Sequence, residues 1–298
     1  MKVLSDTETL STDAPIACAM GVYDGVHLGH QAIIKELHKK AQLRGKKCVV
    51  TFSPHPAEIL TCKPTSLIVS LAHRLHLLEL YGIDYVLVLP FTPLLAAQPY
   101  DEFLHTLRKK IPFSWLIFGE GSSFGKDRLG TEPKVRLLSQ ALGFDVIYLK
   151  KETHHKEVIA SGAIRKAIRA CELKKIKKML GRPYSIWVPY SPADSKRENE
   201  TLCKWSTTCH YLCPLPNGVY GVDLETTTSK TAAIAFVNAT TDLQRKPMLT
   251  LDLFFDTPPP AATHLNIAFV DYLHEAIDVN TLETFLSSTK QKLSPQPT

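Results

Sequence analysis

The sequence contains no continuous apolar stretch of the roughly 18 residues that a membrane-spanning helix requires, so we expect no such helix. The N-terminal segment MKVLSDTETLSTD is polar and acidic, whereas a secretory signal peptide is basic and then apolar. The chain has seven cysteines but no Cys-x-x-Cys pair, which favours reduced thiols. Together these absences predict a cytoplasmic protein.

A dense basic face is also missing from the sequence. The net charge is +6, and the most concentrated group of lysines is KKIKK at 174–178. Such a run is typical of a solvated helix face, and nucleic-acid-binding proteins usually carry a denser basic patch. We therefore predict small-molecule partners, with no nucleic acid and no membrane surface.

One group of cysteines is close together in the sequence, at Cys203, Cys209 and Cys213, with His210 among them. Its spacing fits no established zinc pattern. We therefore predict no metal held by protein side chains, and the role of this cluster stays open at this point.

The phosphate-binding pattern GxxxxGK[ST] does not occur, which excludes the commonest phosphate cradle. The first half of the chain instead alternates strand-like and helix-like segments, which is typical of a doubly wound α/β domain with a parallel sheet. In such sheets, ligands bind beyond the carboxyl ends of the strands. The predicted strands are 15–20, 46–52, 85–91, 115–119 and 145–151, and the predicted helices are 30–43, 71–82, 100–111 and 133–143.

The pattern of alternating strand-like and helix-like segments ends after residue 182. Residues 183–210 contain prolines and charges without a clear period, and the segments that follow resemble strands. We expect two domains, 1–182 and 183–298, of which the second is small and β-rich. Its predicted strands are 218–224, 231–238, 248–255 and 265–273, with a terminal helix over 274–293.

The stretch GVYDGVHLGHQAII, residues 21–34, follows the first predicted strand and opens a helix. Glycines let a phosphate approach the backbone, and the N–H groups and dipole of a helix N-terminus attract anions. His27 and His30 add donors that can carry positive charge, which phosphoryl and nucleotidyl transfer require. The alternative is a capped helix with two surface histidines.

Two further segments follow predicted strands. TFSPHP, residues 51–56, places His55 after the second strand, and its alternative interpretation is a proline-rich turn. FGEGSSFGKDRLG, residues 118–130, is glycine-rich and carries Lys126 and Arg128, so it suits a mobile loop over phosphates. The alternative for this segment is a plain surface loop.

IASGAIRKAI, residues 159–168, places Ser161 at a probable helix start, with Arg165 one turn further on. Ser161 can cap the helix, and a guanidinium at Arg165 can bind a phosphate with two parallel hydrogen bonds. An ordinary cap followed by a solvated arginine is the alternative.

These segments together resemble the prokaryotic FAD synthetases, which are bifunctional riboflavin kinase/FMN adenylyltransferases. GVYDGVHLGHQ resembles the family's GNFDGVHLGHQ, and TFSPHP resembles TFEPHP. FGEGSSFGKDRLG is similar to VGxDFRFGKxRxG, IASGAIRKAI to ISSTRIRxAL, and MLGRPYSI to LLGRPYxI. Five matches in the same order over about 165 residues make the resemblance specific.

The resemblance implies a Rossmann-like HxGH nucleotidylyltransferase domain followed by a small riboflavin-kinase-like β-barrel. It implies that FMN and ATP, with Mg²⁺, give FAD and pyrophosphate. His27 and His30 would stabilise charge on the triphosphate, and Ser161 and Arg165 would hold the leaving pyrophosphate. The implied ATP-binding residues are Gly21, Tyr23, Asp24, Gly25, Gly29, His30, Ser161 and Arg165, and the implied FMN-binding residues are His55, Pro56, Phe124, Gly125, Lys126 and Arg128.

The chain departs from the family pattern at four positions of this first part. Val22 replaces an asparagine, and Gly162 replaces a threonine whose hydroxyl would serve a phosphate. Ser122 and Ser123 replace the aromatic residue and the arginine of DFRFG. We expect adenylyl transfer to remain, with an altered acceptor site.

The second part departs further. LPNGVYGV (215–222) and MLTLDLFFD (248–256) resemble kinase-domain segments, but the GRxxGxPTAN element has no counterpart between 183 and 214. Thr250 stands where the family has its catalytic glutamate, and threonine cannot act as the general base for a riboflavin hydroxyl. The resemblance therefore implies a six-stranded barrel-like fold without kinase chemistry, retained for structure or self-association.

Three alternatives remain open. The chain is either fully bifunctional, or an adenylyltransferase for another phosphorylated acceptor, or a non-catalytic regulator that binds flavin or nucleotide. The intact histidine pair opposes the last, because a binding module does not need two imidazoles.

Overall fold

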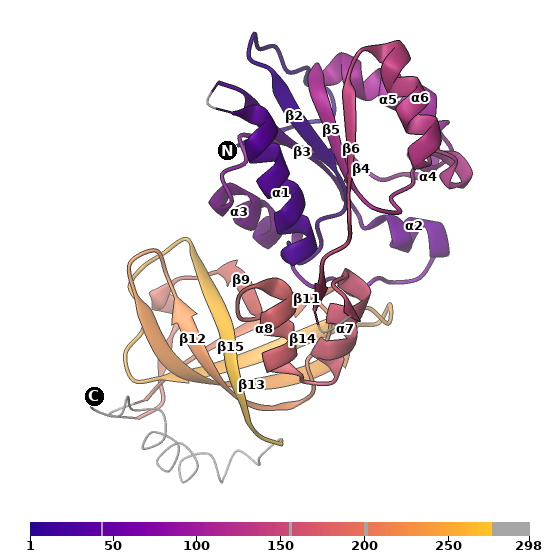
Figure 1. The fold of residues 1–298 in the computed structure, drawn as a ribbon. Coiled ribbons are helices and arrows are strands. Elements are labelled where there is room, and N and C mark those ends of the chain that lie inside the picture. Colours follow the sequence, from indigo (N-terminus) through magenta and orange to yellow (C-terminus); the bar gives the residue numbers. More distant parts are fainter. Residues whose placement is uncertain (43, 155–156, 200–201, 276–298) are drawn as a thin grey trace. The chain divides into compact units, whose positions relative to one another are not determined.

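The computed structural model describes residues 1–42, 44–154, 157–199 and 202–275 (Figure 1). These residues form two compact units. The N-terminal unit contains residues 1–65 and 74–161, and the C-terminal unit contains residues 66–73 and those from 162 onward. The predicted division of the chain into domains 1–182 and 183–298 stays a prediction.

The N-terminal unit is built on a six-stranded sheet in which every neighbouring pair is parallel. Helices α1 and α3 cover one face and α5 and α6 the other, so the doubly wound prediction is confirmed (Figure 1). The strand order is β1-β4-β3-β2-β5-β6. The strands are β1 (Lys2–Leu4), β2 (Ile16–Met20), β3 (Lys46–Ser53), β4 (Tyr85–Pro90), β5 (Phe113–Gly119) and β6 (Asp145–Leu149), and the helices are α1 (Leu28–Ala41), α3 (Leu71–Leu80), α5 (Tyr100–Lys110) and α6 (Glu132–Leu142).

Apolar periodicity explains why these segments form these elements. All five residues of β2 are buried, as expected for a strand covered on both faces. On α5 the buried residues Phe103, Leu104 and Leu107 recur at helical spacing. The same helix has acidic residues in its first turn and basic residues in its last, which complements the helix dipole.

The elements that the sequence did not predict in this unit are short. They span between two and six residues, which is too few for a helical or strand period to be detected. They are β1, α2 (Pro56–Thr61), α4 (Pro93–Ala96), the 3₁₀ helix η1 (Lys126–Arg128), β7 (Thr153–His154) and β8 (Glu157–Val158).

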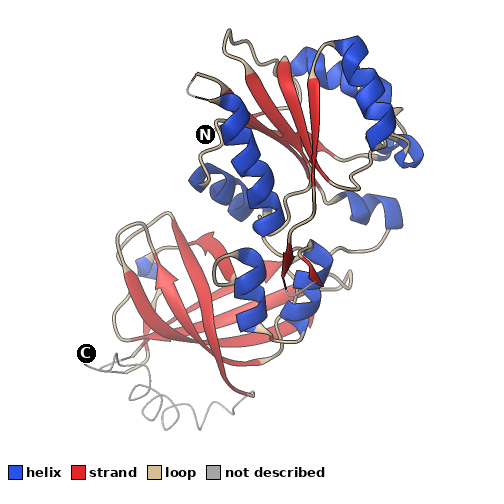
Figure 2. Ribbon diagram, viewed as in Figure 1, coloured by secondary structure: helices blue, strands red, loops and turns tan. Residues whose placement is uncertain are grey.

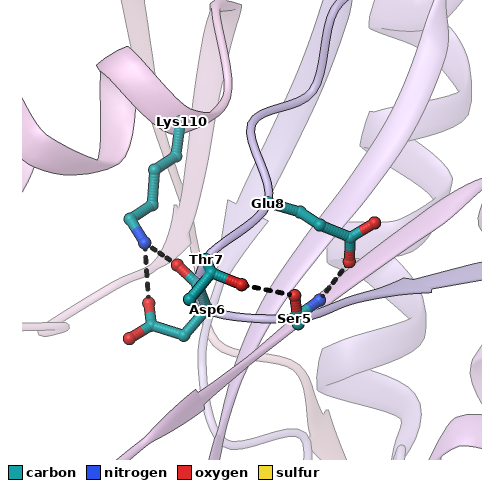
Figure 3. A network of polar contacts seen from close by, with 5 residues as sticks. All are labelled: Ser5, Asp6, Thr7, Glu8 and Lys110. Atoms are coloured by element: carbon teal, nitrogen blue, oxygen red, sulfur yellow. Dashed lines mark hydrogen bonds and ion pairs between the residues drawn. The ribbon is translucent and has the colours of Figure 1, made fainter.

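Polar contacts attach the segment between β1 and β2 to the end of α5 (Figure 3). The Lys110 ammonium donates to the Asp6 carboxylate at 2.8 Å and also to the Asp6 carbonyl. Glu8 accepts from the Ser5 backbone N–H at 2.6 Å. That backbone hydrogen bond, with the nearby Lys2 ammonium, lowers the pKa of Glu8 to about 2. These contacts lie at the surface, where we expect each to contribute little stability.

The strand order reverses between β2 and β5. From β2 the chain proceeds to β3 and β4 on one side of the sheet, and it then returns to β5 and β6 on the other. In doubly wound sheets the carboxyl ends of the two strands at such a reversal bound the ligand crevice. The segments that follow β2 and β5 are residues 21–27 and 120–131, both of which carry predicted site residues.

The C-terminal unit contains a curled seven-stranded antiparallel sheet (Figure 2). The predicted riboflavin-kinase-like, barrel-like fold is therefore confirmed, with seven strands where six were expected. The order is β10-β11-β14-β13-β12-β15-β9, and α8 packs against β15. The elements are α7 (Ser161–Arg169), α8 (Leu173–Leu180), β9 (Ser185–Pro189), the 3₁₀ helix η2 (Pro192–Asp194), β10 (Lys196–Arg197), β11 (Cys203–His210), β12 (Gly218–Glu225), β13 (Lys230–Thr241), β14 (Pro247–Phe255) and β15 (His264–His274).

Residues 183–210 show no clear period in the sequence, yet they contain β9, β10 and β11. The buried positions of β11 include Cys203, Trp205 and Cys209, which lie on one face at even spacing. An alternation of aliphatic residues is absent here because the buried positions hold cysteine and tryptophan, which are often buried themselves. The expected terminal helix over 274–293 lies outside the described residues, except for 274, which ends β15, and 275.

The cysteine cluster is part of this fold. Cys203, Cys209 and Cys213 are buried. Throughout the described ranges, no three histidine, cysteine, aspartate or glutamate side chains are grouped as a metal site would require. The described helices likewise include none that is long and apolar enough to cross a membrane.

Replacing Cys209 with serine tests whether the cluster serves the core. Burial raises the pKa of the Cys209 thiol to about 11, and a buried hydroxyl there should lower the free energy of unfolding by about 1–3 kcal/mol. The exposed Cys62→Ser is the control and should change little. Thermal denaturation with and without a metal chelator measures both effects. A melting temperature of the unsubstituted protein that falls with chelator would contradict the structural role.

Candidate functional site

Residues 21–27, called the glycine loop here, connect β2 to α1 through an unusual backbone path. Tyr23, Gly25 and Val26 have φ angles of 55°, 85° and 41°. Glycine adopts such angles at little cost, but a β-branched residue such as Val26 does so only when its surroundings impose it. Strain of this kind amounts to about 1–3 kcal/mol per residue and tends to occur at functional sites.

Two buried side chains from other elements hold this loop: one bonds to it directly, and the other bonds to the first. Thr51 on β3 donates its hydroxyl to the Val22 carbonyl at 2.9 Å. Arg74 on α3 donates Nη1–H to the Thr51 hydroxyl at 3.0 Å and to the Phe52 carbonyl at 3.1 Å. Neither residue was predicted from the sequence. The available signal was an arginine inside the apolar helix LAHRLHLLEL, and Arg74 is only 2% exposed.

The two histidines of the motif stack on one another at the start of α1. Their ring centroids are 3.7 Å apart with an interplanar angle of 21°, and the Tyr23 ring lies 4.8 Å from His30. His27 is the N-cap residue of α1, and its side chain makes no capping hydrogen bond. The first turn of α1 contains no acidic residue. A helix start of this kind suits an external anion.

The environment of the pair keeps His30 neutral. Burial lowers the pKa of His30 well below its usual 6.5, and the neighbouring His27 and the Arg74 guanidinium lower it further. Its Nδ1 is buried and has no hydrogen-bond partner among the residues that the structure describes. A bound polyanion would favour the charged form of His30 and so oppose these effects.

Gly29 lies close beneath the His27 ring, so a side chain there would crowd it. A Cβ at Gly29 would lie 3.2 Å from His27 Cε1 and 3.3 Å from its Nδ1. The carbonyl oxygen of Ile159 would be 3.6 Å away. Gly29 therefore leaves space for the imidazole, and its part in ATP binding stays a prediction.

The structure brings Ser161 to the glycine loop from 137 residues away. The Ser161 hydroxyl donates to the Asp24 carbonyl oxygen at 3.1 Å. Asp24 is 1% exposed, and its carboxylate acts to raise the pKa of Arg74, although the larger effect of burial lowers it. Arg165 lies one turn along α7 and belongs to the C-terminal unit. Its role toward phosphate stays a prediction.

The predicted residue His55 follows β3, one strand away from the reversal between β2 and β5. It is the N-cap of α2, and its Nδ1 accepts from the Ala57 backbone N–H at 3.1 Å. Pro56 is the first residue of α2. The imidazole thus helps to form the turn after β3, and contact with FMN stays a prediction for both residues.

The loop at 120–131 follows β5 and folds against neighbouring residues. The Phe124 ring packs against Phe118 and Phe103, at centroid distances of 5.5 and 5.8 Å. Gly125 has a φ of 72°, and a Cβ there would lie 2.7 Å from the Tyr100 backbone. The folding of the loop therefore depends on two of the predicted FMN-binding residues.

The two cations of this loop are exposed. Lys126 and Arg128 project from the 3₁₀ helix η1. The Arg128 Nε–H donates to the Ser123 hydroxyl at 2.9 Å. Ser123, which departs from the family pattern, therefore holds the Arg128 side chain. Whether these cations contact a phosphate stays a prediction.

A Gly29→Ala substitution should displace the His27 ring by a few tenths of an ångström. The methyl group meets that ring, whereas alanine in a helix is favoured over glycine by about 1 kcal/mol. We expect shifted imidazole resonances of His27 and His30 and little loss of melting temperature. Gly162→Ala is the matched control, because no atom lies within 4 Å of its added Cβ. Unchanged imidazole resonances in Gly29→Ala would contradict the packing argument.

The lowered pKa of His30 predicts a pH dependence of stability. Below about pH 6.5 the unfolded chain binds a proton at His30 that the folded protein does not, so the free energy of unfolding falls as pH decreases. This destabilisation is absent above about pH 7. His30→Gln should lose less stability than the unsubstituted protein between about pH 7.5 and 5.5, measured by urea denaturation. The exposed His105→Gln is the control, and equal pH profiles for all three proteins would refute the assignment.

Comparison with known proteins agrees with the motifs at this site. The family model described as FAD synthetase matches residues 10–163, slightly more than half of the chain. A bifunctional riboflavin kinase/FMN adenylyltransferase of Listeria monocytogenes is 32% identical over 178 residues, which cover 58% of this chain and 56% of the relative. The protein of that name from Escherichia coli K12 is 29% identical over 191 residues, with 62% and 61% covered. The chain thus aligns with less than two thirds of the length of these relatives.

A solved structure resembles the whole chain in fold. The crystal structure titled macrolide-efflux protein from Streptococcus pneumoniae covers 99% of both chains, with a TM-score of 0.78 and 20% sequence identity. At that identity the likeness shows the fold alone. The family is shown by the match over residues 10–163, and the chain belongs to the FAD synthetase family.

Proposed function

We propose that this protein is an FMN adenylyltransferase, which transfers AMP from ATP to FMN and releases pyrophosphate. The observation that carries the proposal is the stacked pair of His27 and His30 at the start of α1. The pair lies after β2, beside the reversal of strand order, where doubly wound sheets bind ligands. Membership of the FAD synthetase family supports FMN as the acceptor.

In the proposed reaction, a phosphate oxygen of FMN attacks the α-phosphorus of ATP. The bond from that phosphorus to the bridging oxygen of the β-phosphate breaks, and the electron pair leaves with pyrophosphate. Such transfers need positioning and charge stabilisation rather than a protein nucleophile. The imidazoles of His27 and His30 donate N–H groups to the triphosphate, and the N-terminus of α1 adds its dipole.

The other predicted residues divide between the two substrates. Gly21, Tyr23, Asp24 and Gly25 shape the loop that receives ATP, and Ser161 hydrogen-bonds to that loop. Arg165 holds the leaving pyrophosphate. On the acceptor side, the segments after β3 and β5 receive FMN, through His55, Pro56, Phe124, Gly125, Lys126 and Arg128.

Magnesium enters with ATP as part of the substrate. In the described ranges no cluster of three carboxylate, histidine or cysteine ligands could form a dedicated metal site. Mg²⁺ commonly keeps its waters and binds to substrate phosphates with one or two carboxylates. The chemistry of the site therefore fits an ion whose ligands come mainly from the triphosphate.

We further propose that riboflavin kinase activity has been lost. Thr250, the counterpart of the family's catalytic glutamate, lies on β14 opposite Thr208 and Asn238 of the neighbouring strands. These three positions carry no carboxylate, and no hydroxyl there has the basicity of a general base. The nearby Asn217 uses its Oδ1 to accept from the Ala239 backbone N–H at 2.7 Å. The unit retains its fold, and its use in self-association stays a prediction that light scattering would test.

The test is the separation of flavins by chromatography after incubation with ATP, Mg²⁺ and either FMN or riboflavin. We expect FAD from FMN and no phosphorylated flavin from riboflavin. His30→Ala should lower kcat by about 100- to 1,000-fold, the usual effect of removing one charge-stabilising donor. His105→Ala, an exposed histidine on α5, is the matched control and should retain the activity of the unsubstituted protein.

Other outcomes would select another function. FMN formed from riboflavin would show a bifunctional enzyme. No product with either flavin, but turnover with another phosphorylated acceptor, would show a changed substrate. Binding of ATP or FMN without turnover of any acceptor would show a regulator.

A further inference from the structure

The most unusual buried side chain of the N-terminal unit is Arg74, which no motif predicted. We propose that Arg74 is a positioning residue that acts through Thr51 to hold the glycine loop in the conformation that receives the triphosphate of ATP. The inference rests on the proposed function for the identity of the nucleotide. It adds a residue outside the histidine motif to the machinery of the site.

The first step of the argument is geometric. A continuous chain of hydrogen bonds runs from Arg74 Nη1 to the Thr51 hydroxyl at 3.0 Å, and from that hydroxyl to the Val22 carbonyl at 2.9 Å. The Arg74 Nη1 also donates to the Phe52 carbonyl at 3.1 Å, which attaches the guanidinium to β3. Thr51 and Arg74 are 0% and 2% exposed. Buried hydrogen bonds of this kind have little freedom to rearrange.

The second step concerns the backbone that these bonds support. Among the four residues after Val22, three have positive φ: Tyr23, Gly25 and Val26. Since Tyr23 and Val26 adopt such angles only under constraint, contacts outside the loop must maintain them. The Thr51 bond constrains the loop at its beginning, and the Ser161 bond to the Asp24 carbonyl constrains it near its middle.

The third step is electrostatic. Asp24 lies in the loop and is 1% exposed, and its carboxylate favours the charged form of Arg74. The guanidinium in turn disfavours a proton on His30. Arg74 therefore influences the anion site by charge as well as through Thr51. Both effects converge on residues 22–30.

A purely structural role explains Arg74 poorly. Its Nε is buried and has no hydrogen-bond partner within the residues that the structure describes. A buried charge with an unsatisfied donor lowers stability relative to an apolar residue of similar size. Lysine could retain the charge but not the planar, multi-donor geometry. We therefore attribute the presence of arginine at this position to its role in holding the glycine loop through Thr51.

Substitutions at both ends of the chain of bonds test the proposal. Arg74→Met removes charge and hydrogen bonds, Arg74→Lys keeps the charge, and Thr51→Val removes only the bridging hydroxyl. Leu104→Ala, a core substitution on α5 at the opposite face of the sheet, is the destabilised control. The measurements are melting temperature, kcat, the KM for ATP and for FMN, and amide hydrogen exchange of residues 21–27.

We expect Arg74→Met to lower kcat/KM for ATP by about 100-fold, the usual effect of a small misplacement of reacting groups. Its KM for FMN should stay within about twofold, because the acceptor segments follow other strands. Thr51→Val should reproduce the slower turnover and faster exchange, and Arg74→Lys should recover only part of the activity. Leu104→Ala should lose melting temperature while keeping kcat, assayed well below its unfolding transition.

Two results would overturn the proposal. One is an unchanged kcat/KM for ATP in Arg74→Met or Thr51→Val. The other is a loss of activity that follows melting temperature equally in Arg74→Met and Leu104→Ala. If Arg74→Met does not fold, Thr51→Val decides the question. If the unsubstituted protein makes no FAD, the proposed function fails, and ATP binding with hydrogen exchange of residues 21–27 still decides the role of Arg74.

Discussion

The hydrogen bond from the Thr51 hydroxyl to the Val22 carbonyl is the interaction on which the site depends. It joins β3 to the start of a loop whose next residues have strained backbone angles. Arg74 donates a hydrogen bond to the Thr51 hydroxyl, and the Ser161 hydroxyl donates to the Asp24 carbonyl from a distant part of the chain. The start of α1, and with it both imidazoles, takes its position from this arrangement.

The chemistry of the site follows from that position. Stacking the two imidazoles in a partly desolvated place beside a buried guanidinium favours neutral His30. A neutral ring donates one N–H and gains a proton most readily when a polyanion arrives. The same desolvation would strengthen every interaction with the charge that develops during the proposed nucleotidyl transfer. Without a bound anion, the protein therefore carries a buried, neutral His30 beside other donors, and the polyanion of the proposed function would relieve this arrangement.

Several features of the fold followed from local pattern. The parallel sheet and its helices were predictable, because buried strands and amphipathic helices leave clear periods in the sequence. The glycines and histidines of 21–30 were recognisable because a strand followed by a glycine turn and a helix is a known anion site. β11 was missed because its inward positions hold cysteines and a tryptophan. The elements of two to six residues were too short for any period to be visible.

The sequence by itself determined the alternation of elements, the motif that opens α1 and the family to which the chain belongs, since these depend on neighbouring residues. Only the tertiary structure decided which distant groups meet that motif. Thr51 and Ser161 reach Val22 and Asp24 from 29 and 137 positions away, and Arg74 reaches Thr51 from 23 positions away, through strand pairing and helix packing. The structure also decided that Gly29 accommodates the His27 ring and that Ser123 supports Arg128. Such contacts depend on how elements pack, and packing leaves no periodic trace in the order of the residues.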